Sequence, residues 1–337
     1  MRVFGDLIPE NIAPVGARRI GIYNSRGNRL GYVPLGPLGR EIPGRKLYSF
    51  GALSDIHMGE STAREDYSRA LIWLSGNVDF ICECGDLIHG DAGAAPAQIE
   101  QYKSCRAAAS VPVYAIAGNH DGAYVSDIAS AVAEYTGQPL YYSFTQGEDV
   151  FVFVGNASGT AGQLFTKAEL QWLYETLEAN RNRRCFLFQH VRPDDASGNA
   201  LGIYTYDIWR GTEQTVFESL LRHYSNVVFF HGHSHLKFRM QEYAKGANYD
   251  RTFGCHSIHI PSVSVPREMS AAADSGLAAV YAASEGYVVE VYEGGIHLRG
   301  RDFVSGEYLP LASYWLDTPK RIISPETYTD STGLIKT

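Results

Sequence analysis

Five short motifs carry side chains that could bind metal ions together. In chain order they are Asp55-Ile56-His57, Gly85-Asp86, Gly118-Asn119-His120-Asp121, His190 and Gly232-His233-Ser234-His235. The candidate ligands among them are Asp55, His57, Asp86, Asn119, His190, His233 and His235. These side chains offer imidazole nitrogen and carboxylate or amide oxygen, without a thiolate. Such a donor set suits borderline divalent metals, namely Mn, Fe, Co or Zn.

The order of the motifs points to two metal ions and to hydrolysis. A lone D-x-H is usually a surface loop, and a lone G-N-H-D reads first as a turn. All five motifs, however, follow directly after apolar segments, which favours one joint site. A two-metal site needs a shared ligand, and a carboxylate can bridge ions roughly 3.5–4 Å apart. Asp86 is the candidate for this bridge.

The elements that position the motifs are predicted from apolar periodicity. Short segments rich in branched and aromatic residues predict buried strands at 47–53, 78–84, 111–117, 150–154, 185–188 and 227–230. Helical spacing predicts helices at 64–74, 97–109, 125–135, 167–180 and 213–224. Thr166 and Glu169 form a capping-box pattern at the start of the fourth helix. This alternation predicts a largely parallel sheet whose carboxyl ends carry the site.

The remaining parts of the chain differ in pattern. Strand-like segments at 257–260, 277–281, 287–292 and 296–299, with a turn at Glu293-Gly294-Gly295, predict a second sheet. Residues 1–45 form a Gly- and Pro-rich N-terminal extension in which 19–23 and 29–33 could pair as a hairpin. We expect a catalytic domain at 46–302 and a C-terminal tail at 303–337 that packs on it.

Composition limits the partners and the compartment. The chain has 337 residues, 45% of them hydrophobic, and a net charge of −8, so it has no general attraction to extended nucleic acid. The N-terminus lacks an apolar secretory segment, and no window has the length of a membrane span. Five scattered cysteines, an odd number, favour a reducing compartment, and we expect Cys82 and Cys84 to pack in the core. These features predict a cytoplasmic protein without a membrane contact, and they identify no protein partner.

The motif order resembles the calcineurin-like metallophosphoesterase superfamily, whose pattern is D-x-H, G-D, G-N-H-D/E, H and G-H-x-H. The resemblance covers roughly residues 47–300. It implies an α/β fold of two packed mixed β-sheets flanked by helices, a four-layer α-β-β-α sandwich. It also implies a dinuclear metal-dependent phosphoric ester hydrolase with two divalent or mixed-valence ions.

The resemblance assigns roles to the motif residues. It implies that one ion is held by Asp55, His57, Asp86 and His235, and the other by Asp86, Asn119, His190 and His233. A hydroxide shared by the two ions would attack phosphorus. His120 would contact the phosphate and assist the leaving group, and we expect Asp121 to hydrogen-bond its ring. The expected substrate contacts are Asn119, His120 and Arg192.

Several functions fit this site. Likeness to bacterial phosphodiesterases of the superfamily favours a small phosphodiester as the substrate. A phosphomonoesterase is the first alternative, because Arg192 could clamp a monoester. Residues 54–59 also resemble the opening of the double-strand-break repair nucleases, although the acidic composition opposes a nuclease. A non-catalytic scaffold is disfavoured because every ligand position is filled.

Further candidates for substrate contacts lie in loops near the motifs. His89 comes three residues after Asp86 and could face the cleft. Residues 192–210 and 237–254 carry aromatic and arginine side chains that could hold a base, a sugar or a phosphate. A packed or solvated role is at least as well supported for both loops.

Overall fold

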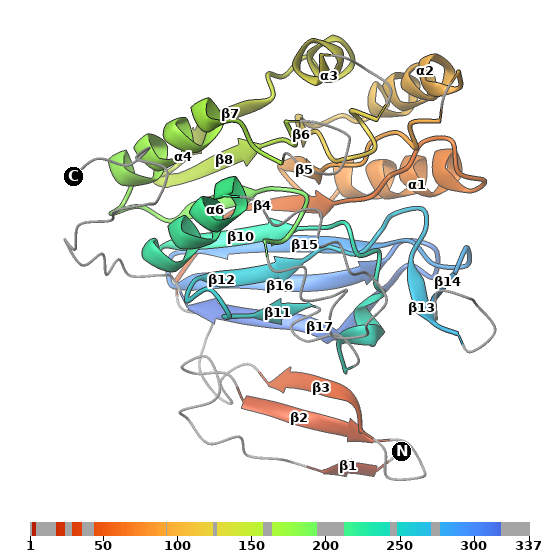
Figure 1. Ribbon diagram of the computed structural model, residues 1–337. Coiled ribbons are helices and arrows are strands. Elements are labelled where there is room, and N and C mark those ends of the chain that lie inside the picture. The colour runs from red at the N-terminus through yellow and green to blue at the C-terminus, as the bar shows by residue number, and fades with distance from the viewer. Residues whose placement is uncertain are drawn as a thin grey trace.

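Two six-stranded sheets pack face to face and are covered by helices on their outer faces (Figure 1). The computed structural model describes residues 2–4, 18–23, 29–35, 44–91, 93–123, 127–157, 164–193, 212–242, 248–270 and 277–317. The expected fold class, two mixed sheets flanked by helices, is confirmed. No helix of these residues is long and apolar enough to cross a membrane.

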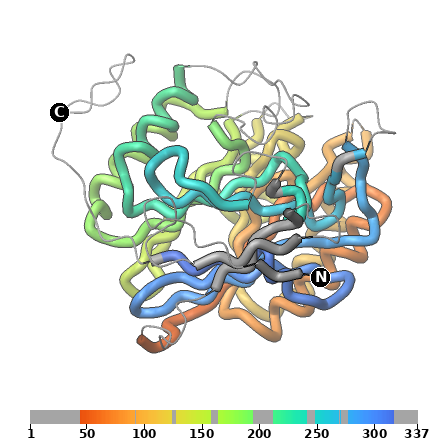
Figure 2. Tube along the Cα trace, turned by 90° about the horizontal axis from the view of Figure 1, so that it is seen from below, coloured from red at the N-terminus to blue at the C-terminus, as the bar shows by residue number. Residues whose placement is uncertain are grey.

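The first sheet combines an early and a late part of the chain. Its order is β17 (Glu307–Asp317), β16 (Gly295–Asp302), β15 (Glu285–Tyr292), β4 (Lys46–Leu53), β5 (Phe80–Cys84) and β6 (Val113–Ile116). The pairs β4–β5 and β5–β6 are parallel, whereas β15 pairs antiparallel with both β4 and β16. Figure 2 shows the orange segment near residue 50 alongside the blue segment near residue 300.

The second sheet carries the later motifs. Its order is β11 (Tyr249–Asp250), β12 (His256–His259), β10 (Val227–His231), β9 (Cys185–Phe188), β8 (Asp149–Val154) and β7 (Tyr141–Gln146). The four central strands are parallel, and the two outer strands are antiparallel to their neighbours. The single, largely parallel sheet predicted from the alternation of strands and helices is therefore wrong. Its strands are divided between two sheets, each completed by antiparallel strands.

Helices cover both outer faces. On the first sheet lie α1 (Ala63–Ser75), α2 (Ala95–Arg106) and α3 (Ile128–Thr136), and on the second lie α4 (Lys167–Ala179) and α6 (Thr212–His223). The predicted capping box is present at α4, where Thr166 Oγ1 accepts from Glu169 N and Glu169 Oε2 accepts from Thr166 N. These bonds satisfy two backbone donors that a helix start leaves without partners.

Two smaller groups of strands lie outside the six-stranded sheets. β1 (Arg2–Phe4), β2 (Arg18–Tyr23) and β3 (Arg29–Leu35) make an antiparallel sheet, with β2 and β3 paired as in the expected hairpin. β13 (Arg267–Met269) and β14 (Leu277–Ala279) form a separate two-stranded ribbon. Residues 307–317, expected in the C-terminal tail, form the edge strand β17, and residues 318–337 lie outside the described residues.

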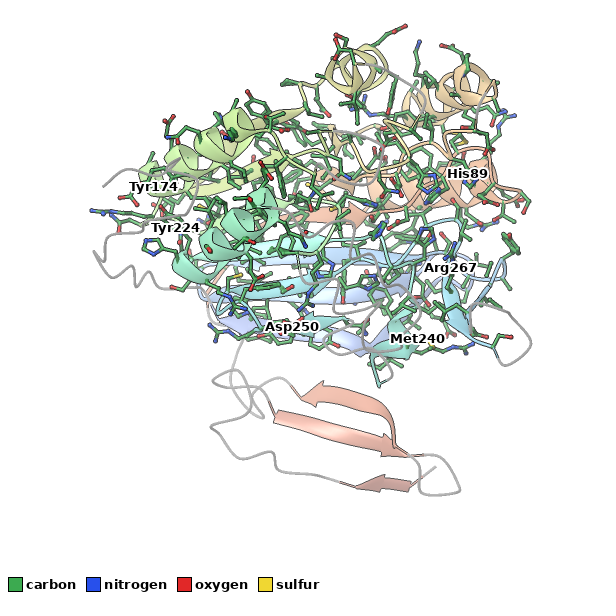
Figure 3. All side chains as sticks on the ribbon, in the orientation of Figure 1. His89, Tyr174, Tyr224, Met240, Asp250 and Arg267 are labelled. Atoms are coloured by element: carbon green, nitrogen blue, oxygen red, sulfur yellow. The ribbon has the colours of Figure 1, made fainter. Side chains whose placement is uncertain are left out.

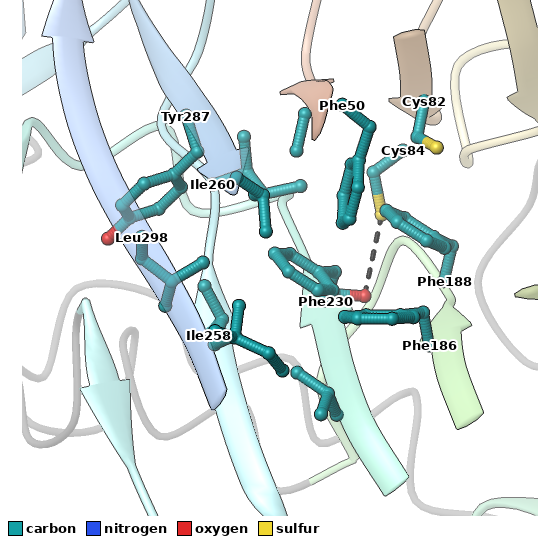
Figure 4. Packing of buried hydrophobic residues seen from close by; sticks show 14 of the residues in the cluster. Phe50, Cys82, Cys84, Phe186, Phe188, Phe230, Ile258, Ile260, Tyr287 and Leu298 are labelled. Carbon is teal, nitrogen blue, oxygen red and sulfur yellow. Dashed lines mark hydrogen bonds between the residues drawn. The ribbon is translucent and has the colours of Figure 1, made fainter. Parts of the chain in front are cut away.

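An aromatic core joins the sheets. Phe50 of β4 is fully buried, and its ring centroid lies 5.2 Å from Phe151, 5.3 Å from Phe186 and 5.9 Å from Phe230. Cys82 and Cys84 are free and buried in the same cluster, and Cys84 Sγ donates to the Phe230 carbonyl at 3.5 Å (Figure 4). The two cysteines are therefore core residues, as expected.

The central position of Phe50 gives a stability prediction. Phe50→Ala removes a ring that contacts strands of both sheets, and we expect a loss of about 3–5 kcal/mol in the free energy of unfolding. Denaturant-induced unfolding followed by circular dichroism measures this change. Leu47→Ala is the control on the same strand, because Leu47 is 44% exposed. Equal losses in the two variants would contradict the assignment of Phe50 to the centre of the core.

Candidate metal centre

The motifs lie in loops at the carboxyl ends of strands from both sheets. Asp55 and Asp86 each lie two residues beyond a strand of the first sheet, and His190 and His233 lie two residues beyond strands of the second. Backbone bonds tie neighbouring loops together, since Asp55 N donates to Gly85 O at 3.1 Å and His57 N to Asp86 O at 2.8 Å. The packed sheets therefore deliver both groups of motifs to one rim.

Strained backbone conformations direct the candidate ligands inward. Among the described residues, the non-glycine residues with positive φ are Asp55, His57, Asp86, His233 and His235, with φ of 52°, 46°, 52°, 71° and 59°. Each left-handed conformation costs roughly 1–3 kcal/mol and persists only where the surrounding structure imposes it. All five residues are predicted metal ligands, so the strain is concentrated at this site.

Two motif glycines allow the loops to approach each other closely. A Cβ atom at Gly118 would collide with the Asp86 carboxylate and backbone. A Cβ atom at Gly232 would collide with the side chains of Ser54 and Asp55. Glycine is therefore required at the first position of the G-N-H and G-H-x-H motifs, because another loop occupies the space that a side chain would fill.

The first cluster contains Asp55, His57, Asp86 and His235. Their nearest ligand atoms all lie within 4.8 Å of one another. His57 Nε2 lies 3.1 Å from His235 Nε2, and His235 Nε2 lies 3.1 Å from Asp55 Oδ1. Ligands about 2.1 Å from one ion are separated by roughly 3.0–3.4 Å. The spacing thus fits a single coordination sphere.

The second cluster shares Asp86 with the first. It joins Asp86, His190 and His233 within the same 4.8 Å limit, and Asp86 Oδ2 lies 3.1 Å from His190 Nε2. Asp86 Oδ2 is also 3.4 Å from His57 Nε2 of the first cluster. One carboxylate therefore lies between two groups of ligands, which is the position expected of a bridge.

Polar atoms without hydrogen bonds support the fit to metal. Asn119 Oδ1 is buried and has no hydrogen-bond partner among the described residues. Asp86 Oδ2 and His190 Nε2 are also buried, and the polar atoms close to them belong to other candidate ligands. Buried polar atoms are almost always hydrogen-bonded, so each exception calls for a specific cause. Buried oxygen and imidazole nitrogen atoms that face one another in this way are suitable ligands for a borderline divalent cation.

Backbone carbonyls orient two of the histidines. His190 Nδ1 lies 2.6 Å from Cys84 O, and His235 Nδ1 lies 3.1 Å from Val265 O. A carbonyl only accepts, so Nδ1 carries a proton and Nε2 faces the cluster, where the neutral ring offers its lone pair. This is the tautomer that binds a metal.

The buried carboxylates of the site are stabilised by neighbouring positive charge. Burial opposes ionisation of Asp86, but the nearby His190 and His120 hold its carboxyl pKa well below the usual range. Burial also opposes charge on His190, yet Asp86 and Asp55 raise its pKa to about 9. Burial lowers the pKa of His57 to about 3. Two ionised carboxylates in a buried site require compensation by an imidazolium or by a metal cation.

His120 lies beside the first cluster, and its neighbour Asp121 has an unexpected contact set. The His120 ring centroid is 4.6 Å from that of His57, and His120 N donates to Asp86 Oδ1 at 2.8 Å. The prediction that Asp121 hydrogen-bonds this ring is wrong, because His120 Nδ1 instead lies 2.6 Å from His89 O. The buried Asp121 carboxylate accepts from the backbone N–H groups of residues 87, 88 and 118 and from Tyr135 Oη. Asp121 therefore holds two motif loops together.

Arg192 also differs from its predicted role. The residue is 3% exposed, and its guanidinium pairs with both oxygens of the Asp250 carboxylate. It also lies over the Phe253 ring at 5.1 Å. These contacts join the segment after β9 to β11 and to the residues that follow β11. Arg192 therefore forms an internal ion pair, and its predicted role as a phosphate clamp is wrong. Residues 194–211 and 243–247 of the candidate substrate loops lie outside the described residues.

Some residues that support the site were missed by the sequence analysis. Ser262 Oγ donates to Asp55 O at 2.7 Å, and Ser264 Oγ donates to Ile56 O at 2.6 Å. Both are buried and hold the first motif from a segment about two hundred residues later. The alternating serines after β12 are a visible signal, but nothing in the sequence indicates which loop they contact.

The sequence and the fold both resemble those of known proteins. The sequence matches the calcineurin-like phosphoesterase family over residues 48–237, so the chain belongs to that family, which is one of metal-binding hydrolases. The purple acid phosphatase PPD1 from seeds of yellow lupin (Lupinus luteus) is 13% identical, with a TM-score of 0.53, over 89% of this chain and 59% of that one. GAP50, the anchor in the inner membrane complex of Plasmodium, is 13% identical, with a TM-score of 0.51, over 82% and 90%. These two similarities show the fold alone. No curated protein matches the sequence.

A buried glutamate anchors the chain directly after the last motif. Glu285 is 3% exposed, and its Oε2 accepts from Phe238 N at 2.7 Å. Burial raises the pKa of Glu285 to about 7, although Phe238 N–H and Lys237 act in the opposite direction. The folded protein therefore favours the protonated carboxyl more than the unfolded chain does.

This raised pKa gives a pH prediction. The protonated Glu285 carboxyl contributes its full stabilisation below the unfolded pKa near 4.5, and this stabilisation is lost as pH rises through about 7. Glu285→Gln keeps an oxygen acceptor for Phe238 N–H but does not ionise. We expect the variant to become more stable than the parent by up to about 3 kcal/mol between pH 5 and pH 8. Unfolding of both proteins at each pH in a chelator measures this difference, and a pH-independent difference would rule out the assignment.

Proposed function

We propose that the protein is a dinuclear metal-dependent phosphoric ester hydrolase acting on a small phosphodiester. The observation that carries the proposal is the convergence of two ligand clusters on Asp86. The first ion would be held by Asp55, His57, Asp86 and His235, and the second by Asp86, Asn119, His190 and His233. The ions would be Mn, Fe, Zn or Co, in divalent or mixed-valence form.

The chain's own residues have distinct tasks in this reaction. Bound metal ions supply Lewis acidity toward the phosphate and lower the pKa of water. His120 Nδ1 is held by the His89 carbonyl, so Nε2 is the ring nitrogen left to meet the substrate. A proton on that nitrogen would pass to the departing oxygen. The bond from His120 N to Asp86 Oδ1 keeps the ring beside the bridge.

Charges around the site support a diester over a monoester. Glu60 and Asp91 flank His89, at 3.4 Å from its Nδ1 and 3.5 Å from its Nε2. These carboxylates repel a dianionic monoester more than a monoanionic diester. Arg192, the residue that could have clamped a monoester, is paired with Asp250.

Other properties of the chain support a small substrate and a reducing compartment. The net charge of −8 disfavours an extended nucleic acid as substrate. All five cysteines are free and buried, which supports a cytoplasmic location. The proposed chemistry requires neither a membrane nor a protein partner.

The bridging role of Asp86 gives a test of the proposed function. In metal-stripped protein reconstituted with Mn, Fe, Zn or Co, we expect hydrolysis of bis(p-nitrophenyl) phosphate to exceed that of p-nitrophenyl phosphate. Asp86→Asn should reduce turnover at least about 100-fold, because an amide cannot bridge two cations as a carboxylate does. Asp127→Asn is the control, since Asp127 caps α3 and asparagine caps a helix equally well. Preference for the monoester would overturn the diester assignment. Absence of turnover with every metal would overturn the proposal that the protein is an enzyme.

The role of His120 gives a separate prediction. His120→Ala should retain bound metal but lose about 10²- to 10⁴-fold in turnover of a diester with an alkoxide leaving group. The loss should be smaller with a p-nitrophenolate leaving group, which departs without a proton. Metal analysis and steady-state kinetics with both esters measure these effects. Loss of metal from the variant would instead make His120 a ligand.

A further inference from the structure

His57 differs from His190 and His235 in the partner of its Nδ1 atom. The other two rings are fixed by backbone carbonyls, whereas His57 Nδ1 lies 3.3 Å from the Nδ1 atom of His89. His57 is 2% exposed, while the His89 side chain is 30% exposed. Figure 3 shows His89 at the end of the molecule that carries α1, far from Tyr174 and Tyr224.

The position of His57 determines which nitrogen must carry its proton. Its Nε2 lies 3.1 Å from His235 Nε2 and 3.4 Å from Asp86 Oδ2, so Nε2 is the atom that faces the candidate ion. A histidine that binds an ion through Nε2 is a neutral imidazole and carries one ring proton. A lone pair on Nε2 then requires that proton on Nδ1. His89 Nδ1 must accept it.

Two carboxylates beside His89 influence whether its Nδ1 atom can accept the His57 proton. Asp91 Oδ1 lies 3.5 Å from His89 Nε2 and favours the tautomer with the proton on that nitrogen. This leaves the Nδ1 lone pair facing His57. Glu60 Oε1, 3.4 Å from His89 Nδ1, favours the opposite tautomer, so the two carboxylates compete.

The backbone of His89 fixes its place beside both site histidines. His89 N donates to Met58 O at 3.0 Å, and His89 O receives the Nδ1 proton of His120. The ring centroid of His89 lies 5.4 Å from that of His57 and 5.3 Å from that of His120. The side chain therefore serves His57, and the carbonyl serves His120.

We propose that His89 is a positioning residue whose Nδ1 atom accepts the Nδ1 proton of His57 and so presents the His57 Nε2 lone pair to the first ion. The inference rests on the proposed function only in that His57 binds an ion through Nε2. His89 thus occupies the place that a backbone carbonyl has at His190 and His235. The affinity of one ion, but not of the other, depends on this side chain.

Two variants separate hydrogen bonding from packing. Asparagine places an acceptor oxygen near the position of the histidine Nδ1, whereas leucine places a methyl group there. His297→Leu is the matched control, since the His297 side chain is 29% exposed and pairs with Glu290 at 3.3 Å, much as His89 pairs with Glu60. Titration of metal-stripped protein with Mn²⁺ and with Zn²⁺ gives the affinity and number of sites without any need for turnover.

We expect His89→Leu to weaken one of the two sites about 10- to 100-fold, the usual effect of removing the partner of a metal-binding histidine. His89→Asn should recover most of this loss, and His297→Leu should match the parent. Nitrogen-15 shifts of labelled histidine should show the His57 proton on Nδ1 in the parent and in His89→Asn.

Three results would overturn the proposal. These are parent-like affinity in His89→Leu, equal weakening by leucine and asparagine, or a His57 proton found on Nε2 in the metal-loaded parent. Failure of the proposed function would look different, because the parent would then bind two ions without hydrolysing any ester. Failure of the His89 proposal leaves turnover intact but removes the difference between the two His89 variants.

Discussion

The structure depends on the burial of two ionised carboxylates where the two sheets meet. Asp55 is 0% exposed and Asp86 is 1% exposed, and each is held in a left-handed backbone conformation. Burial opposes their charge, so the site must contain compensating cations or histidinium groups. The strained loops, the close glycines and the oriented histidines all serve to keep these carboxylates in place. Relief of this buried charge is the physical basis of metal binding in our account.

The two-sheet architecture provides the rigid frame that this arrangement requires. An aromatic core centred on Phe50 fixes one sheet on the other, and both sheets direct the carboxyl ends of their parallel strands to the same rim. Backbone hydrogen bonds then join loops of one sheet, as between Asp55 and Gly85, and loops of the other, as between Gly232 and His190. Asp121 and the serines at 262 and 264 add side-chain bonds from distant segments. The frame therefore imposes conformations that no single loop would adopt alone.

Much of the candidate site could be predicted from the sequence because its candidate ligands are grouped in short local motifs. Asp55, His57, Asp86, His190, His233 and His235 all reach the clusters, and most strands and helices occur where apolar periodicity indicates. Apolar periodicity did not reveal how the strands divide between the two sheets, because β4 pairs with β15 across more than two hundred residues. The roles predicted for Asp121 and Arg192 were wrong for the same reason. Their partners are distant backbone N–H groups and Asp250, and sequence spacing does not reveal such contacts.

The most direct test of this account is anomalous diffraction from crystals of the protein loaded with Mn or Zn, with data at the absorption edge of the metal. We predict two peaks roughly 3.5–4 Å apart, with the Asp86 carboxylate between them and His57 and His190 on opposite sides. A single peak, or two ions without Asp86 as a common ligand, would contradict the central claim that this buried carboxylate joins two metal ions.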